Sequence, residues 1–273
     1  MPESGAAPWA LEGVSAGYGR REVLHAVDLE VPRGRVTAVI GPNGCGKSTL
    51  LRVLGRLLVP SDGRVLLDGL PLASLGRREV ARRLALLPQN PVAPEGMTVA
   101  DLVARGRQPH QPWYRQWSAE DDQLVARACA ATGVTELTDR PLEELSGGQR
   151  QRAWIAMALA QQTDLLLLDE PTTHLDLAHA ADVMDLVVGL RRDAGKTVVA
   201  VLHDLSLAAR YSDHVVVVDG GRVVATGPPD EVITRELLQA TFGLRAHVFP
   251  DPHEGLLTVV PAVSGRGAPA AGP

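Results

Sequence analysis

The chain has 273 residues, a hydrophobic fraction of 45% and a formal net charge of −5 at pH 7. It is apolar enough for a folded core, and its acidic balance argues against a broad nucleic-acid surface. Two cysteines exclude a disulfide framework, and no apolar run approaches the roughly 20 residues that span a bilayer. The first ten residues do not form a secretory signal, so we expect a soluble cytoplasmic protein.

Apolar runs alternate with helical patterns along the chain, which predicts an α/β fold with a parallel sheet. Near the start, Leu11–Tyr18 and Glu22–Val31 have mixed patterns that predict an antiparallel layer. Runs that are apolar throughout predict buried strands at Val36–Ile40, Leu84–Leu87, Leu165–Leu168 and Val198–Leu202. Ligands bind at the carboxyl ends of parallel strands, so the polar residues that follow these runs are candidates for a site.

Helical patterns dominate residues from about 91 to 160, which predicts a helical insertion between two core strands. Further on, Val215–Val218 and Arg222–Ala225 flank two glycines and predict a hairpin. The pattern of Asp230–Phe242 predicts a terminal helix, and residues 263–273 have the composition of a disordered tail.

A phosphate-binding loop is predicted between the first buried strand and an amphipathic helix. The pattern G-x-x-x-x-G-K-[ST] is met by Gly41, Pro42, Asn43, Gly44, Cys45, Gly46, Lys47, Ser48 and Thr49. Glycines let backbone N–H groups approach phosphate oxygens, and the helix N-terminus attracts the same anion. Lys47 can reach the β- and γ-phosphates of ATP, and the Ser48 hydroxyl can ligate Mg²⁺. The plainer alternative is a glycine-rich turn that only opens a helix.

Cys45 lies inside this loop, near a helix N-terminus where a thiol can be reactive. We interpret it first as a small residue that fits a tight turn, and second as a redox-sensitive group.

Two carboxylates follow the strand Leu165–Leu168. Asp169 can hold the shell of a Mg²⁺ ion, and Glu170 can polarise an attacking water as a general base. An acidic strand cap in a surface loop is the alternative. Behind a phosphate loop, the pair favours metal-assisted phosphoryl chemistry.

The segment Leu145-Ser-Gly-Gly-Gln149 is typical of ATP-binding cassette (ABC) transporter ATPases, and the sequence resembles this family over nearly all of residues 10–260. The resemblance implies a P-loop NTPase (RecA-like) core with a parallel sheet, an N-terminal antiparallel β layer and an inserted α-helical subdomain. It implies one domain over residues 8–262. Its expected parts are a core (1–90 and 161–229), a helical subdomain (91–160) and a C-terminal extension (230–262).

The same resemblance assigns roles to individual residues. Tyr18 looks like the aromatic residue that stacks on adenine, with an ordinary strand aromatic as the alternative. Gln89 looks like the glutamine that senses Mg²⁺ and the attacking water, and His203 like the switch histidine that contacts the γ-phosphate. Asp176 lies in the loop that crosses between subunits. A metal site at His174, Asp176 and His179 is the less favoured interpretation of that loop.

A head-to-tail dimer follows from the resemblance, because each ATP lies between the phosphate loop of one chain and the signature segment of the other. That segment is Ser146, Gly147, Gly148 and Gln149. Backbone donors and a serine hydroxyl at a helix N-terminus form a second anion site. The implied cofactors are ATP and Mg²⁺. The implied partners are a second copy, two integral membrane permease subunits and, indirectly, a substrate-binding protein, at the cytoplasmic face of the membrane.

A narrower resemblance points to ATPases of iron–siderophore importers, especially the ferric enterobactin type. It is carried by Arg105–Gln111, Trp113–Trp117, Ser146–Leu159, Val201–Leu205 and Asp251-Pro252. We therefore expect an ATP-hydrolysing subunit that powers ferric siderophore uptake. The alternatives are another cargo (haem, cobalamin or another metal chelate) and a soluble ABC ATPase without a membrane partner. A small-molecule kinase does not explain residues 145–149.

Overall fold

The computed structural model describes residues 7–111 and 117–262. A six-stranded sheet forms its centre, in the order β10-β9-β3-β8-β7-β6, and all its neighbouring pairs are parallel except β9 with β10. Its strands are β3 (Val36–Ile40), β6 (Leu84–Leu87), β7 (Leu165–Asp169), β8 (Thr197–Val201), β9 (His214–Asp219) and β10 (Arg222–Gly227). Every residue of β3, β7 and β8 is buried, which is why these strands are apolar runs.

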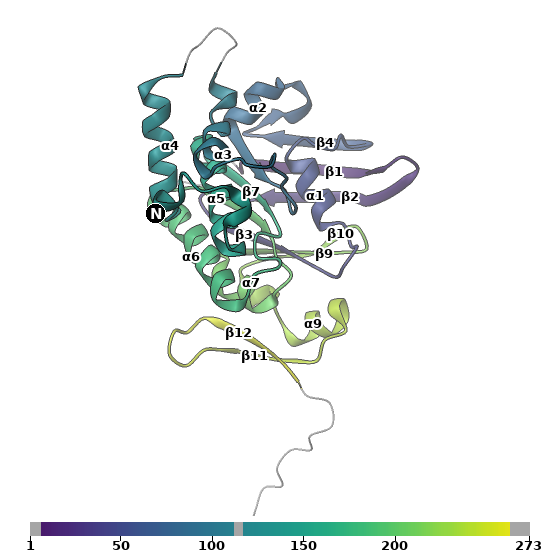
Figure 1. The fold of residues 1–273 in the computed structure, drawn as a ribbon. Helices are drawn as coiled ribbons and strands as arrows, with labels where there is room; N and C mark the ends of the chain where they lie inside the picture. The colour runs from purple at the N-terminus through teal and green to yellow at the C-terminus, as the bar shows by residue number, and fades with distance from the viewer. Residues whose placement is uncertain (1–6, 112–116, 263–273) are drawn as a thin grey trace, which may run out of the picture.

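An antiparallel sheet covers one face of the central sheet, with the order β2-β1-β4-β5 (Figure 1). Its strands are β1 (Trp9–Tyr18), β2 (Arg21–Val31), β4 (Asp62–Leu67) and β5 (Leu70–Pro71). The helix α1 (Lys47–Leu54) packs between the two sheets. Trp9, Leu24 and Leu50 are fully buried there, so the antiparallel layer and α1 share one hydrophobic core.

Helices cover the other face of the central sheet. Its strands are contacted by α5 (Gly147–Ala160), α6 (Leu177–Ala194) and α7 (Leu205–Tyr211), whereas α3 (Val99–Arg105) and α4 (Ala119–Ala131) pack on α5. A separate hydrophobic core therefore lies on each face of the central sheet. Neighbouring residues of β3 point to opposite faces, so Ile40 packs with the helices and Val39 packs with the antiparallel layer. Between β6 and β7, the described residues form helices, turns and one isolated bridge, as the helical pattern predicted.

A buried arginine ties three of these helices together. Arg107 follows α3, and its guanidinium donates to Asp121 Oδ1 in α4 at 2.9 Å and to the Ala160 carbonyl at the end of α5 at 2.8 Å. Arg107 and Asp121 are both buried. Ser118 caps α4, and its hydroxyl also donates to Asp121. This ion pair therefore fixes the position of α5, the helix that begins with the signature segment.

The end of the chain differs from its predicted structure. The single helix predicted over Asp230–Phe242 is instead two helices, α8 (Pro229–Val232) and α9 (Arg235–Phe242). The break occurs because Thr234 is extended and its hydroxyl caps α9 by accepting from Leu237 N at 3.2 Å. A short helix, α2 (Arg77–Arg83), lies between β5 and β6.

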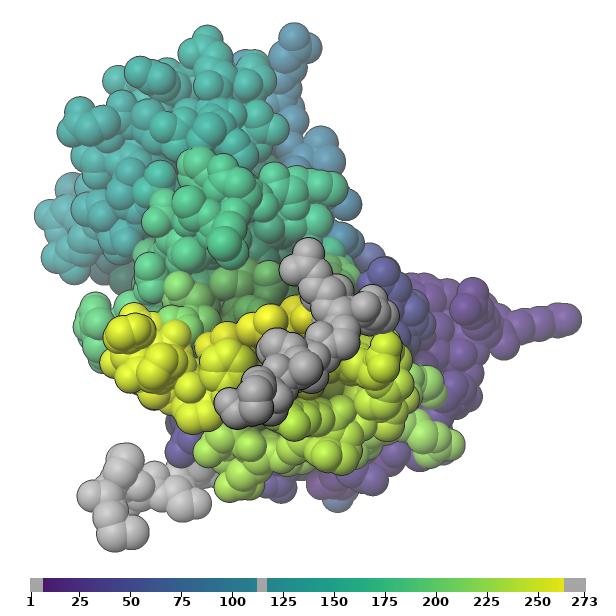
Figure 2. Space-filling view, turned by 90° about the horizontal axis from the view of Figure 1, so that it is seen from below, coloured from purple at the N-terminus to yellow at the C-terminus, as the bar shows by residue number. Residues whose placement is uncertain are grey.

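A hairpin that the sequence patterns did not predict follows α9. Its strands β11 (Ala246–Pro250) and β12 (Leu257–Pro261) lie across the lower face of the molecule (Figure 2). β12 packs along α7, and the Ser206 hydroxyl donates to the Val259 carbonyl at 3.2 Å. The tail predicted at 263–273 lies outside the described residues. Among the residues that are described, no helix is long and apolar enough to cross a membrane.

Candidate active site

The phosphate loop connects β3 to α1 and is held open by its glycines. Gly41 has a φ of 155°, and a Cβ added there would lie 2.0 Å from the Val218 carbonyl oxygen, so only glycine fits. The ammonium of Lys47 donates to the carbonyls of Gly41 and Pro42 at 2.8 Å each. Within the described part of the chain it forms no ion pair, which leaves its charge available to an anion.

Cys45 is a buried thiol in the same loop. A Cβ at Gly41 would lie 2.7 Å from its sulfur, so the two residues are packed closely. Burial raises the pKa of Cys45, and this effect outweighs the opposing influence of Lys47. The thiol is therefore protonated at neutral pH, which favours its interpretation as a small residue that fits the turn.

At the end of β7, Asp169 lies beside the first turn of α1. The Ser48 hydroxyl donates to Asp169 Oδ1 at 3.0 Å. Burial raises the pKa of Asp169, and the hydrogen bond from Ser48 opposes the rise. A hydroxyl and a carboxylate are the hard oxygen ligands that Mg²⁺ prefers, so these two residues fit that ion. Asp169 lines a hollow of about 180 Å³ that is also lined by Arg52 and Gln89.

Glu170 has both carboxylate oxygens occupied by donors from three separate segments. Gln89 Nε2, after β6, donates to Oε2 at 2.5 Å, and the Thr173 hydroxyl donates to the same oxygen at 3.0 Å. His203 Nε2, beyond β8, lies 2.5 Å from Oε1. A carboxylate can only accept, so that histidine nitrogen carries the proton. The fold thus brings together the three residues predicted as catalytic, Glu170, His203 and Gln89.

The backbone of Glu170 is in the left-handed region, with a φ of 53°. This conformation is costly for a residue with a side chain. The Glu170 side chain is only 8% exposed. Gln89 was predicted to accompany Ser48 and Asp169 at the metal, whereas its amide here contacts Glu170.

Tyr18 ends β1 and is 45% exposed. Arg52 of α1 donates to its hydroxyl at 2.7 Å, and the guanidinium carbon lies 5.9 Å from the ring centroid. Arg52 thus orients the partly exposed ring at the end of the hairpin formed by β1 and β2.

The signature segment forms the start of α5 through a capping box. Ser146 Oγ accepts from Gln149 N at 3.3 Å, and the Gln149 side chain accepts from Ser146 N at 3.1 Å. Ser146 and Gly147 are exposed, whereas Gly148 is buried. The N-terminus of a 14-residue helix is therefore presented at the surface with a serine hydroxyl beside it.

Asp176 is the N-cap of α6. Its Oδ1 accepts from His179 N at 2.9 Å and lies 2.8 Å from His179 Nδ1, and these hydrogen bonds lower the pKa of Asp176. The less favoured metal interpretation finds no support, because among the described residues no three His, Cys, Asp or Glu side chains are placed to hold a metal ion.

Sequence reasoning left two contributions unidentified. It assigned no role to Thr173, whose bond to Glu170 follows from a turn that places it three residues further along the chain. Arg107 and Asp121 form a buried pair that no local pattern signals. In the aromatic segment 113–117, only Trp117 lies within the described residues, where its indole donates to Asp122 at 2.6 Å.

Three comparisons with known proteins agree with this geometry. Residues 24–173 match the ABC transporter family. The chain is 50% identical over 258 residues to the ferric enterobactin transport ATP-binding protein FepC of Escherichia coli (strain K12), covering 94% of each chain. It superposes on an ABC transporter chain solved in an inward-facing conformation with a TM-score of 0.82 and 28% identity, covering 95% of this chain and 98% of that one.

A bacterial ABC transporter cassette, MJ0796, solved as a dimer, superposes with a TM-score of 0.70 and 28% identity, covering 81% of this chain and 98% of that one. The match in sequence, the match in fold and the clustered acidic and phosphate-loop residues lead to one conclusion. The chain belongs to the ABC transporter family, as one of its ATP-hydrolysing subunits.

Proposed function

We propose that this chain is the ATP-hydrolysing subunit of an importer that carries ferric siderophore across the cytoplasmic membrane. One observation carries the enzymatic part of the proposal. Glu170 and its three donors lie at the end of β7, beside the Ser48–Asp169 pair and the phosphate loop. The cargo is inferred from the 50% identity to a protein named for ferric enterobactin transport.

In this proposal, ATP binds with its phosphates in the loop 41–49 and its adenine on Tyr18. Backbone N–H groups and the N-terminus of α1 face the phosphates, and Lys47 exchanges its carbonyl partners for phosphate oxygens. Ser48, Asp169 and Gln89 are the residues that would hold Mg²⁺, which would neutralise phosphate charge when bound.

Hydrolysis then needs a base for the attacking water. Glu170 accepts a proton as the water oxygen bonds to the γ-phosphorus, and the bond from that phosphorus to the β–γ bridging oxygen breaks. The three present donors take three of the roughly four acceptor positions of the carboxylate, and the position left on Oε1 is available to the water proton. His203 is the candidate to turn from Glu170 to the γ-phosphate, because its side chain is 41% exposed.

A second copy of the chain completes the site in this proposal. Each chain has one phosphate loop and one exposed signature segment, so two copies arranged head to tail enclose two ATP molecules. The solved dimer of a related cassette supports this assembly. Asp176, exposed at the start of α6, is then the residue of the crossing loop.

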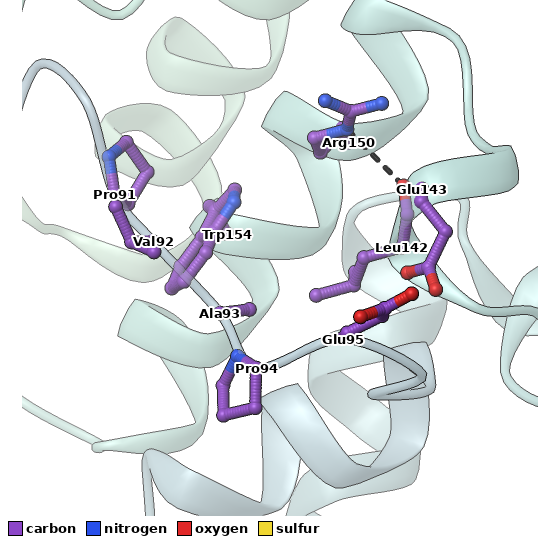
Figure 3. A pocket seen from close by; sticks show the side chains of 9 residues that line it. All are labelled: Pro91, Val92, Ala93, Pro94, Glu95, Leu142, Glu143, Arg150 and Trp154. Atoms are coloured by element: carbon purple, nitrogen blue, oxygen red, sulfur yellow. Dashed lines mark hydrogen bonds between the residues drawn. The ribbon is translucent and has the colours of Figure 1, made fainter.

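The membrane subunits are proposed to dock in a groove of about 400 Å³ between residues 91–95 and the start of α5 (Figure 3). Val92 is 89% exposed at its wall, and the indole of Trp154 lies opposite. Arg150 Nε donates to the Leu142 carbonyl at 3.1 Å and so fixes one side of the groove. An exposed apolar wall suits a helical segment of a permease at the cytoplasmic face of the membrane.

Capture of the Glu170→Gln protein from native membranes tests this proposal. We expect two copies of an integral membrane permease to copurify with it, and we expect cells lacking the protein to lose growth on ferric siderophore as the sole iron source. Growth on haem and uptake of cobalamin should be retained. If the cells lost only growth on haem or uptake of cobalamin, the proposed cargo would be wrong. If no membrane protein were captured, the proposed role in transport would be wrong.

A further inference from the structure

The imidazole of His179 contacts two segments that are proposed to face the opposite subunit. His179 lies in the first turn of α6, where its backbone N–H already satisfies the capping carboxylate of Asp176. Its ring makes a second bond to the same oxygen, with Nδ1 2.8 Å from Asp176 Oδ1. The carboxylate can only accept, so Nδ1 carries the proton. An ordinary helix cap needs the first bond and not the second.

The carbon edge of the same ring packs on the signature segment of the same chain. A Cβ added to Gly148 would lie 2.7 Å from His179 Cδ2 and 3.1 Å from Cγ, so the ring rests directly on the Gly148 backbone. The Leu175 side chain lies against Gly147 in the same way, where a Cβ would be 3.2 Å away. The crossing loop and the signature segment are therefore in contact through the residues on either side of Asp176.

We propose that His179 is a positioning residue that joins Asp176 to the signature segment, so that the two reach the opposite subunit as one surface. The imidazole is suited to this because it donates from one edge while its carbon edge packs against a glycine. The side chains of His179 and Asp176 are 44% and 66% exposed, which leaves the joined surface open to a partner. The inference rests on the proposed head-to-tail dimer.

The predicted effect is on dimerisation and not on nucleotide binding by one chain. In the Glu170→Gln background, His179→Ala should weaken ATP-dependent dimerisation about tenfold, because two contacts between the segments are lost. His179→Asn should recover most of that loss, since its amide can donate from the position of Nδ1. Gly148→Ala, which pushes the ring away, should weaken dimerisation like His179→Ala.

Sedimentation velocity with ATP and Mg²⁺ measures the fraction of the protein that is dimeric. Equilibrium binding of a fluorescent ATP analogue measures the affinity of one chain for nucleotide. Asp182→Ala, an exposed change one turn later on α6, is the matched control and should leave both unchanged. Asp176→Ala combined with His179→Ala should lose less than the product of the two single losses, because the side chains of the two residues act through one bond.

The outcomes distinguish a failure of the proposed dimer from a failure of the role proposed for His179. If the Glu170→Gln protein does not dimerise with ATP, the proposed dimer and this inference both fail. If it dimerises and His179→Ala behaves as Asp182→Ala does, the dimer stands and the role of His179 is refuted. Equal losses for His179→Ala and His179→Asn would also refute the role of the Nδ1 bond.

Discussion

The two regions that are proposed to face phosphate are built in opposite ways. The phosphate loop lies at the ends of buried strands, where Lys47 and Asp169 are each 5% exposed. The signature segment and Asp176 lie at the starts of two helices, and their polar side chains are exposed and held by local caps. The buried region is preorganised for chemistry, whereas the exposed region is complete only against a partner. Mutations should therefore separate chemistry, rigidity and binding.

The largest expected effect is on turnover. Glu170→Gln removes the proposed base while keeping the shape of the site, so ATP hydrolysis should fall roughly 10²- to 10⁴-fold. ATP binding should persist and the dimer should accumulate. Phosphate release measures turnover, and Glu144→Gln, an exposed carboxylate near the signature segment, is the control. Turnover within threefold of the unmodified protein would refute the general-base role.

The next effect is on stability, because a buried ion pair anchors α5 at the end opposite to the signature segment. Arg107→Ala leaves the Asp121 carboxylate buried without its partner, which should lower the free energy of unfolding by about 3 kcal/mol. Urea denaturation measures this, with the exposed Arg105→Ala as the control. Equal stabilities of the two variants would contradict this account of α5.

The same pair predicts an acid dependence. Burial opposes ionisation of Asp121, but hydrogen bonds from Arg107 and Ser118 outweigh it and lower its pKa from 3.8 to about 2. A depressed pKa gives stability that is present above the ordinary value and is lost as the pH falls through the folded one. Stability should therefore decline between about pH 4 and pH 2. In Asp121→Asn this part of the decline should be absent.

The buried region should bind nucleotide through Lys47 whether or not the exposed region contacts a second subunit. Lys47→Ala should weaken ATP binding about tenfold to a hundredfold, the range for hydrogen bonds to charged groups. The other lysine of the chain, Lys196, precedes β8 at the opposite end of the sheet and is the matched control. Isothermal titration calorimetry compares the ATP affinities of Lys47→Ala and Lys196→Ala. Equal affinities would show that Lys47 does not bind ATP.

The smallest effect is expected at Cys45. Cys45→Ser should change ATP affinity less than about threefold, because both side chains are small. Since burial raises the pKa of this thiol above 9.0, alkylation by iodoacetamide should be slow at pH 7 and faster at higher pH. ATP should protect Cys45, and it should not change the alkylation of Cys129. ATP binding that survives confirmed alkylation of Cys45 would contradict this packing.

The central sheet could be predicted from the sequence because it is buried on both faces. β3 and β6 have the predicted bounds, β7 is one residue longer at its end, and β8 is shifted by one residue at both ends. The hairpin β11–β12 could not be predicted, because it has two exposed edges and a weak apolar pattern. The helical break at Thr234 depends on one side-chain cap within a continuous helical pattern.

The types of the site residues could also be predicted, but not their contacts. Motifs select Gln89, Glu170 and His203, each placed after a different buried strand. Gln89 and Glu170 are 81 residues apart in the chain, and no local pattern encodes the bond between their side chains. The contact of His179 with Gly148 likewise depends on how α5 and α6 pack. Such contacts follow from strand order and helix packing, which single motifs do not specify.

Helix α5 has a consequence for anyone who wishes to redesign this subunit. Its first turn carries the signature segment, and Arg150 and Trp154 of the groove follow within the next two turns. Gln149 and Trp154 are thus separated by only about 8 Å of unbroken helix. If the proposed dimer and docking groove are correct, substitutions on this wall of the groove will disturb nucleotide binding between the subunits, so a new permease should be accommodated from the opposite wall. Residues 91–95 are the segment in which to vary the sequence.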